Sequence, residues 1–264
     1  MEKIALLFPG QGSQYVGMGK TLHDKFKVAQ EVFKEAEEVL GYDVKKLCFE
    51  GPFEKLTEPE FIQPAILVTS VAAFRIFEES IGIKPEYLLG HSFGELSALV
   101  CAGAISFADA IKIAKLKGEY VKKQIEKEST AMSVITGVNE KIVRKACEDA
   151  TSAQSQVVVG MVNSPQQVVI TGHEAAVKIA EDKLKKKGEI ERLRVKAPFH
   201  SLILGPAAQK IKADLEKIKY EKFDFPVISS VTGKIYKDKK EINEYLSNKF
   251  KLEEKEIEWL RNIE

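Results

Sequence analysis

The clearest chemical signal in the sequence is the pentapeptide Gly90-His91-Ser92-Phe93-Gly94, which has the form Gly-x-Ser-x-Gly. A short apolar run precedes it and a helical pattern follows it. This context predicts a sharp strand-to-helix turn that exposes Ser92, with flanking glycines that let the backbone pack closely. We interpret Ser92 as a nucleophile and the backbone N–H of Phe93, at the positive end of the helix, as an oxyanion donor. The alternative is a glycine-rich turn with an incidental serine.

A serine nucleophile needs a general base, and the sequence has four histidines. His23 is expected at a polar helix start and His173 at a surface turn, while the side chain of His91 should point away from that of Ser92. His200 lies later in the chain, in the order found in serine hydrolases. We therefore choose His200 as the base, against the alternative of a structural histidine. The sequence indicates no carboxylate to orient it.

A glycine-containing segment, Phe8–Gln14, follows the first apolar strand. It has neither the full dinucleotide-binding pattern nor a Walker lysine, so a phosphate-binding loop is disfavoured. We expect instead a loop beside the serine turn that contributes a second backbone N–H to the oxyanion site.

The elements that position these residues alternate between strand and helix signals, which favours an α/β fold with a mainly parallel sheet. Strands are predicted over residues 4–8, 87–89 and 227–231. Helices are predicted over residues 24–40, 65–79, 93–101, 106–124 and 206–218, and in the Lys/Glu-rich tail from Lys234.

The middle of the chain follows a different order. Strands are predicted over residues 131–135, 156–162, 167–171 and 190–195, with helices over 139–150 and 174–187. The order β-α-β-β-α-β is that of a ferredoxin-like unit. We therefore predict a large α/β catalytic domain formed by residues 1–128 and 196–264, into which a ferredoxin-like subdomain of residues 129–195 is inserted.

Composition excludes several classes of protein. Forty basic and 39 acidic residues give a net charge of +1, which is no footprint for nucleic acid. No run approaches the roughly eighteen apolar residues of a membrane span. Cys48, Cys101 and Cys147 are far apart, so we expect reduced thiols in a cytoplasmic protein and no metal site.

Five groups of residues occur together in one order along the chain: Phe8–Gln14, Gln63-Pro64-Ala65, Gly90–Glu95 with Ser97-Ala98-Leu99, Asn163-Ser164-Pro165 with Val168-Val169-Ile170, and Phe199-His200-Ser201. In order and spacing they resemble the malonyl-CoA:acyl-carrier-protein transacylases and the acyltransferase domains of polyketide synthases. The resemblance runs from residue 4 to about residue 232. It implies an α/β-hydrolase-like large domain with an inserted ferredoxin-like small subdomain.

The resemblance also implies a function. The expected reaction is ping-pong transfer of a malonyl or other short acyl group from CoA to the phosphopantetheine thiol of an acyl carrier protein, in fatty acid or polyketide biosynthesis. Ser92 would carry the acyl group, His200 would act as base, and the backbone N–H groups of Gln11 and Phe93 would hold the oxyanion. The expected substrate-binding residues are Gln63, His91, Lys117, Asn163 and Phe199. No cofactor is expected besides the CoA thioester substrate, and we expect a monomer that binds neither nucleic acid nor membrane.

Two departures from the family pattern leave alternatives open. Lys117 stands where the family has a malonate-binding arginine, so it either pairs with malonate through a single compact charge or is a solvated lysine of a lysine-rich helix. An acyl hydrolase that releases acyl groups from carriers would use the same Ser92 and His200. The chain also runs into a Lys/Glu-rich tail in place of the family's segment that orients the histidine, which leaves an inactive carrier-docking homologue as a further alternative.

Overall fold

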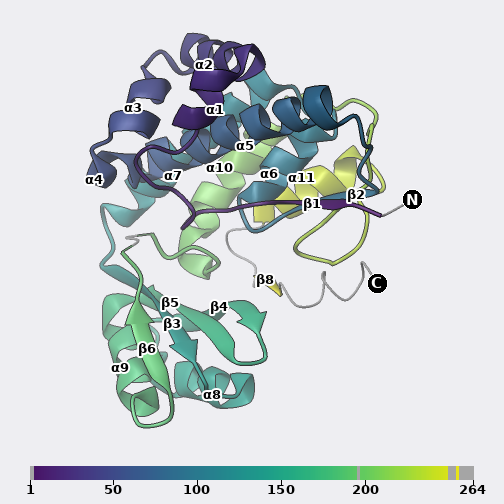
Figure 1. The fold of residues 1–264 in the computed structure, drawn as a ribbon. Coiled ribbons are helices and arrows are strands. Elements are labelled where there is room, and N and C mark those ends of the chain that lie inside the picture. The colour runs from purple at the N-terminus through teal and green to yellow at the C-terminus, as the bar shows by residue number, and fades with distance from the viewer. Residues whose placement is uncertain (1–2, 195–196, 249–253, 256–264) are drawn as a thin grey trace. The chain divides into compact units, whose positions relative to one another are not determined.

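The computed structural model describes residues 3–194, 197–248 and 254–255 (Figure 1). The chain forms two compact units. The first unit comprises Met1–Glu119, Ala213–Ser229 and Ile235–Ile242, and the second comprises Tyr120–Lys212, Ser230–Lys234 and Asn243–Glu264.

The sheet of the first unit is parallel, as the sequence predicts. Its described strands are β1 (Ala5–Phe8), β2 (Tyr87–Gly90) and β7 (Val227–Ile228), in the order β1-β2-β7. Leu88 and Leu89 of the central strand are fully buried, which is typical of a parallel strand covered on both faces. The register places Phe8 beside Gly90, so the two strands end at the same edge of the sheet.

Helices pack around this sheet. Those that lie wholly in the first unit are α1 (Lys20–Lys25), α2 (Lys27–Leu40), α3 (Val44–Glu50), α4 (Phe53–Leu56), α5 (Pro59–Ile81) and α6 (Gly94–Cys101). Three more contribute residues to both units: α7 (Phe107–Ile125), α10 (Gly205–Leu215) and α11 (Lys239–Asn248). The sequence misses the short helices α3 and α4. The predicted helix over 24–40 is interrupted at Phe26, whose backbone is extended with φ −126° and ψ 124°.

Local residues mark the ends of two helices. The N–H of Asp109 donates to the hydroxyl of Ser106 at 3.1 Å, which caps the start of α7. Helix α2 ends at Gly41, which adopts the left-handed conformation. Among the described helices only α5 is long and apolar enough to span a membrane. Of its most apolar 18-residue segment, 61% is buried inside the protein.

The second unit is ferredoxin-like. Its elements are β3 (Thr130–Thr136), α8 (Glu140–Ala150), β4 (Val157–Ser164), β5 (Gln167–His173), α9 (Glu174–Leu184) and β6 (Glu189–Arg192). These four strands pair antiparallel in the order β6-β3-β5-β4, the arrangement that the β-α-β-β-α-β order requires. A further strand, β8 (Glu254–Lys255), runs parallel to β4.

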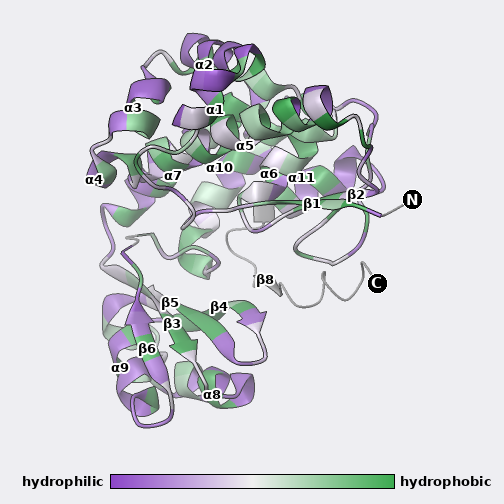
Figure 2. Ribbon diagram, viewed as in Figure 1, coloured by the Kyte–Doolittle hydropathy of each residue, from purple (hydrophilic) through white to green (hydrophobic). Residues whose placement is uncertain are grey.

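The two helices of this unit cover one face of its sheet. Val143 and Cys147 of α8 and Val177 of α9 share an apolar cluster with Val159 of β4 and Ile170 of β5. Figure 2 shows β4 and β5 as largely hydrophobic and β6 as largely hydrophilic. The sheet therefore buries its central strands and exposes an edge.

The segment after β6 contains a 3-10 turn, η1 (Leu202–Leu204), and helix α10 (Gly205–Leu215). Residues 197–212 belong to the second unit, although the sequence assigns them to the large domain. The reason is local packing, because His200 lies against strand β4, where a Cβ built on Gly160 would be 3.3 Å from the Cβ of His200. The predicted domain boundaries stay a prediction.

Candidate active site

Ser92 occupies a strained turn between β2 and α6. Its φ is +48°, in the left-handed region that side chains other than glycine rarely adopt. Three backbone bonds fix the turn: the N–H of His91 donates to the carbonyl of Phe8 at 3.0 Å, that of Gly94 to the carbonyl of His91 at 2.8 Å, and that of Glu95 to the carbonyl of Ser92 at 3.2 Å. The structure therefore has the strand–turn–helix form that the Gly-x-Ser-x-Gly pattern predicts.

The two flanking glycines are required by backbone contacts. A Cβ built on Gly90 would lie 2.0 Å from the carbonyl carbon of Gly94, and one built on Gly94 would lie 2.2 Å from the carbonyl oxygen of Phe8. Both neighbours are main-chain atoms, which cannot move aside as a flexible side chain would. The glycines thus allow β2 and α6 to meet at a sharp angle.

The loop after β1 lies beside this turn, as predicted. A Cβ on Gly10 would be 2.3 Å from the carbonyl oxygen of His91, and the hydroxyl of Ser13 donates to the carbonyl of Gly10 at 2.8 Å. Within the described part of the chain, the backbone N–H groups of Gln11 and Phe93 donate no hydrogen bond. Both are therefore available to a ligand.

Lys117 is not a solvated lysine. Its side chain is only 9% exposed, and its ammonium nitrogen lies 5.3 Å from the centroid of the Phe93 ring, a cation–π contact. The following Gly118 allows α7 to approach the start of α5, since a Cβ there would lie 2.2 Å from the carbonyl oxygen of Pro59. This packing brings the Lys117 ammonium against the residue next to Ser92.

Gln63, on α5, is 1% exposed. Its side-chain oxygen is buried and accepts no hydrogen bond from the residues that the structure describes. A buried amide oxygen without a donor is unfavourable by about 1–3 kcal/mol, so a ligand donor would stabilise it. This is consistent with the predicted role in substrate binding.

Glu95 is a feature that the sequence does not single out. The carboxyl group is completely buried in the first turn of α6, and the hydroxyl of Tyr236 donates to its Oε1 at 2.8 Å. Glu95 follows Ser92 closely, whereas Tyr236 comes from the segment between β7 and α11. No local pattern in the sequence indicates this pairing.

His200 is the counterpart in the second unit. Its φ is +61° and it is 3% exposed. It lies over a β-bulge, because Val159 pairs with Ile170 and Met161 with Val169, which leaves Gly160 as the extra residue. The bulge and the missing side chain of Gly160 together allow the backbone of residues 199–200 to pack closely against the sheet.

The residues around His200 are held by short-range bonds. The N–H of Phe199 donates to the carbonyl of Ala197 at 2.9 Å, and the hydroxyl of Ser201 donates to the carbonyl of Pro198 at 2.7 Å. Phe199 itself is buried. Asn163, near the end of β4, donates to the side chain of Gln167 at 3.0 Å, and its own side-chain oxygen accepts no bond from the described residues.

Ser92 and His200 share a property that no other residue has in the described chain. They are its only residues other than glycine with a positive φ. Such strain persists only where the surrounding structure enforces it, and it clusters at functional sites. The predicted site residues of the first unit are Gln11, Gln63, His91, Ser92, Phe93 and Lys117, and those of the second are Asn163, Phe199 and His200.

No group of three or more His, Cys, Asp or Glu side chains in the described ranges is arranged to hold a metal ion.

Residues 5–255 match the family described as acyl transferase domain. Two transacylases from Bacillus subtilis, each named malonyl CoA-acyl carrier protein transacylase, are 39% and 40% identical to 93% of this chain. The chain spans 62% of the length of the first and 78% of the second. These matches define the class of protein as an acyltransferase.

Solved structures agree. A type II PKS acyl-carrier protein in complex with its malonyl-transacylase matches at TM-score 0.95 and 37% identity over 99% of this chain and 85% of the other. The malonyl CoA-acyl carrier protein transacylase of Coxiella burnetii matches at TM-score 0.95 and 34% identity, over 99% and 83% of the two chains. The chain belongs to the malonyl-CoA:acyl-carrier-protein transacylase family, and the predicted resemblance and fold class are confirmed.

Proposed function

We propose that this protein transfers a malonyl group, or another short acyl group, from CoA to the phosphopantetheine thiol of an acyl carrier protein through an ester on Ser92. The observation that carries the proposal is the shared backbone strain of Ser92 and His200 in a chain of this family. The substrate class is that of the similar transacylases, which act on malonyl-CoA and an acyl carrier protein by name.

In the first half-reaction, the hydroxyl oxygen of Ser92 attacks the thioester carbonyl carbon while its proton passes to the imidazole of His200. The carbonyl oxygen becomes an oxyanion that accepts hydrogen bonds from the N–H groups of Gln11 and Phe93. When the C–S bond breaks, the CoA sulfur takes the proton from His200 and CoA leaves as a thiol.

In the second half-reaction, the carrier thiol attacks the acyl-Ser92 carbonyl and gives its proton to His200. The same N–H groups stabilise the second oxyanion. The C–O bond to Ser92 breaks, the serine oxygen recovers a proton from His200, and the acyl carrier thioester leaves. No redox step or cofactor is needed besides the CoA thioester substrate.

Lys117 is the proposed partner of the malonate carboxylate. Its buried ammonium, beside Phe93, is next to the proposed oxyanion donor. A lysine offers one compact charge where arginine would offer a two-pronged fork, so the carboxylate is held less rigidly. Gln63, His91, Asn163 and Phe199 complete the proposed acyl site.

We further propose that the enzyme works in the cytoplasm as a monomer. Cys48, Cys101 and Cys147 are all free and buried, as expected for a reducing compartment. Light scattering on the purified protein tests whether it is a monomer. Fractionation of cells tests whether it lies in the cytoplasm.

The decisive experiment measures the mass and lifetime of the acyl-enzyme. The protein is mixed with malonyl-CoA or acetyl-CoA, with and without a carrier thiol. We expect one acyl group on Ser92, stable in water and discharged by the carrier, and none in Ser92→Ala. Rapid discharge by water without the carrier would instead make the protein an acyl hydrolase. No adduct and no thiol release would indicate a non-catalytic homologue.

Lys117→Arg tests the acyl preference. We expect kcat/KM for malonyl-CoA to rise several-fold relative to acetyl-CoA, about 1 kcal/mol, because a bidentate pair replaces a single charge. The matched control is Lys123→Arg on the same helix. Unchanged malonyl kinetics in Lys117→Arg would show that Lys117 does not hold the carboxylate.

A further inference from the structure

The side chain of Phe93 makes a contact that the proposed reaction does not use. Only the backbone N–H of this residue takes part in that reaction, whereas the ammonium nitrogen of Lys117 lies over its ring, 5.3 Å from the ring centroid. This distance is within the range of about 6 Å over which the face of an aromatic ring attracts a cation. The residue that follows Ser92 therefore holds a positive charge against its side chain.

The ring and the ammonium group are both buried. Phe93 is 3% exposed, and Lys117 is the only buried lysine among the residues that the structure describes. An ammonium group that has lost its water is costly unless other groups stabilise its charge, and the attraction of a ring for a cation is larger where water is excluded. The Phe93 ring therefore replaces part of the water that Lys117 has lost.

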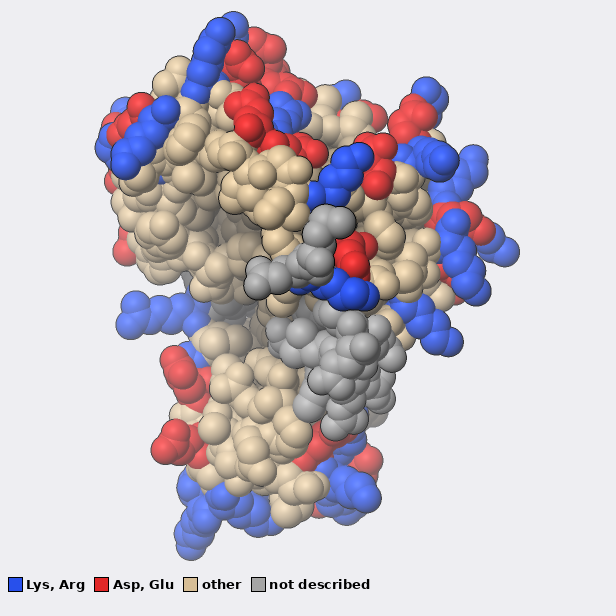
Figure 3. Space-filling model, turned by 45° about the vertical axis from the view of Figure 1, so that its right-hand side comes forward, with Lys and Arg blue, Asp and Glu red and all other residues tan. Residues whose placement is uncertain are grey.

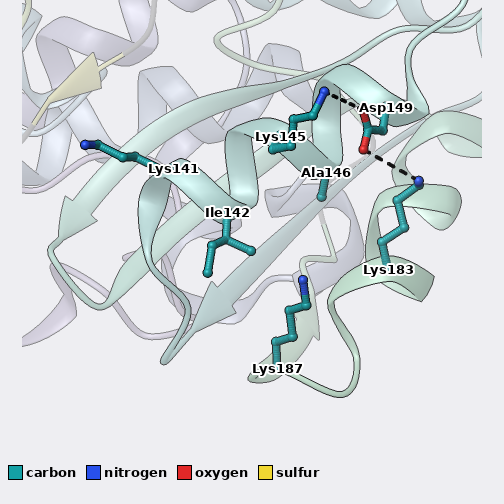
Figure 4. A pocket seen from close by; sticks show the side chains of 7 residues that line it. All are labelled: Lys141, Ile142, Lys145, Ala146, Asp149, Lys183 and Lys187. Atoms are coloured by element: carbon teal, nitrogen blue, oxygen red, sulfur yellow. Dashed lines mark ion pairs between the residues drawn. The ribbon is translucent and has the colours of Figure 1, made fainter.

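The other lysines are held differently. Figure 3 shows Lys and Arg side chains that extend outward from the surface, many of them beside Asp and Glu. In the second unit, for example, Asp149 lies 2.8 Å from the ammonium nitrogen of Lys145 and 3.9 Å from that of Lys183 (Figure 4). A carboxylate cancels the charge of its partner, but an aromatic ring has no net charge. Contact with a ring therefore holds an ammonium group in place and preserves its charge.

The backbone on both sides of this contact is fixed by close packing. Phe93 is the first residue of the turn into α6, with φ −60° and ψ −26°, and the next residue, Gly94, fits against main-chain atoms of the loop after β1. Gly118, next to Lys117, fits in the same way against the start of α5. The stem of a lysine is flexible, however, and its ammonium group is a compact charge that has no fixed direction. The ring supplies a restraint on the ammonium group that the lysine itself lacks.

The Phe93 ring does not belong to an aromatic cluster. Phe74, by contrast, contacts the rings of Phe8, Phe77 and Phe225 at centroid distances of 6.1, 6.5 and 6.2 Å. Within the described part of the chain, Phe93 contacts no other aromatic ring. A leucine could fill a similar space, so the property that phenylalanine adds at this position is the negative face of its ring.

We propose that Phe93 is a positioning residue for acyl selection, because its ring holds the Lys117 ammonium group where it meets the charged end of the acyl group. The N–H groups that point away from the ring can donate to a carboxylate. The preference for a carboxylated acyl group over a neutral one then depends on the ring as well as on the lysine. This inference rests on the proposed function, in which Lys117 pairs with the malonate carboxylate.

The first test is a double-mutant cycle on the full-length protein. The rate constant kcat/KM for acylation of Ser92 is measured with malonyl-CoA and with acetyl-CoA, and the ratio of the two values is the acyl preference. The variants are Phe93→Leu, which retains the backbone N–H, Lys117→Met, and the two together. We expect Phe93→Leu to lower the preference about fivefold in the unaltered protein and less than about twofold where Lys117→Met has already removed the cation.

The second test changes the charge distribution of the ring and leaves its size nearly unchanged. Phenylalanine with one, two or three ring fluorines is incorporated at position 93, and each fluorine makes the ring face less negative. The preference should fall stepwise toward about one fifth of its original value. A ring that only fills space would give no such series. Because the ring stays in place, the series is informative even if Phe93→Leu fails to fold.

The matched control is Phe107, which is also buried in the first unit and lies 5.5 Å from the guanidinium carbon of Arg75, measured from its ring centroid. The same fluorinated series at position 107 should change the acyl preference by less than about twofold, because Arg75 has no place in the proposed acyl site. Equal falls at positions 93 and 107 would overturn the inference, since the effect would then not depend on Lys117.

Two further results would overturn it. A constant preference across the fluorinated series at position 93 would show that the ring does not act through its charge distribution. An equal fall in Phe93→Leu with and without Lys117→Met would show that the ring acts independently of the lysine. If Lys117→Met lowers the preference in either case, the proposed carboxylate partner stands and only the role of the ring is lost. An unchanged preference in Lys117→Met would refute the carboxylate partner, and this inference with it.

Discussion

The two units each hold one strained residue, and they do so in different ways. In the first unit, Ser92 sits between two glycines that are its near neighbours in the sequence. In the second unit, the glycine that makes room for His200 is Gly160, on a strand far from it in the chain. The comparison shows that backbone strain enforced by neighbouring residues can be predicted from a sequence pattern. Backbone strain enforced by a tertiary contact cannot.

The largest effect is expected from Gly94→Ala. The new Cβ would lie 2.2 Å from the carbonyl oxygen of Phe8 and 2.7 Å from that of Pro9, so β1 or α6 must move. We expect the free energy of unfolding to fall by about 3 kcal/mol, with loss of acylation. Urea unfolding followed by circular dichroism measures the change.

The matched control is Gly41→Ala. Gly41 has φ +74° and no atom within 4 Å of an added Cβ, so only the left-handed backbone opposes the substitution. We expect a loss of about 1 kcal/mol. Equal losses in the two variants would mean that close backbone contact is not what makes Gly94 necessary.

Gly160→Ala perturbs the corresponding contact in the second unit. Here the added Cβ meets side-chain atoms, the methyl of Thr171 at 2.7 Å and the Cβ of His200 at 3.3 Å, so the segment with His200 can shift without loss of the fold. We expect the rate of acyl transfer to fall about a hundredfold, because a displacement of about 1 Å of a catalytic base such as His200 can reduce a rate by that factor. Stopped-flow measurement of thiol release provides the rate.

Gly137→Ala is the control in the same unit, because an added Cβ there meets no atom within 4 Å. It should leave the rate of thiol release unchanged. A normal rate in Gly160→Ala would show that the position of His200 does not depend on the bulge.

The sequence predicts most of the fold because its elements are marked by local chemistry. Gly41 marks the end of α2, and Ser106 with Asp109 marks the start of α7. The ferredoxin-like order follows from alternating strands and helices whose apolar residues all face one cluster. The helices α3 and α4 are missed because they are short and depend on packing rather than on a long amphipathic pattern.

The site is predicted less completely. The serine turn and the adjacent loop are recognisable because glycines occur at fixed spacings around Ser92 and Gln11. Burial of Lys117 is not predictable from its lysine-rich helix, since Gly118 and its contact with α5 decide it. Predictions for residues 249–253 and 256–264 lie outside the described residues.

Tyr236→Phe tests a contact that only the tertiary structure shows. It removes the hydroxyl that donates to the buried carboxyl of Glu95, in the helix that begins beside Ser92. We expect unfolding free energy to fall by about 2 kcal/mol, because a buried acceptor loses a donor. Tyr15→Phe, at a residue 61% exposed, should change stability by less than about 0.5 kcal/mol. Equal stability of Tyr236→Phe and the unaltered protein would contradict this account.

Thiol labelling compares how well the two units exclude water. Cys48 and Cys101 lie in the first unit and Cys147 in the second, and all three are buried. Burial raises the pKa of Cys48 and of Cys147 to about 12 and that of Cys101 well above its usual value, so each stays a protonated thiol at pH 8. The thiolate is the form of cysteine that reacts with an aromatic disulfide. Because the folded protein both suppresses the thiolate and blocks access of the reagent, each cysteine should be labelled at least about a hundredfold more slowly in the folded protein than in the urea-unfolded protein. Site-resolved mass spectrometry measures the three rates. Fast labelling of Cys147 with the other two protected would show that the ferredoxin-like unit opens on its own, and that its core is the weaker of the two.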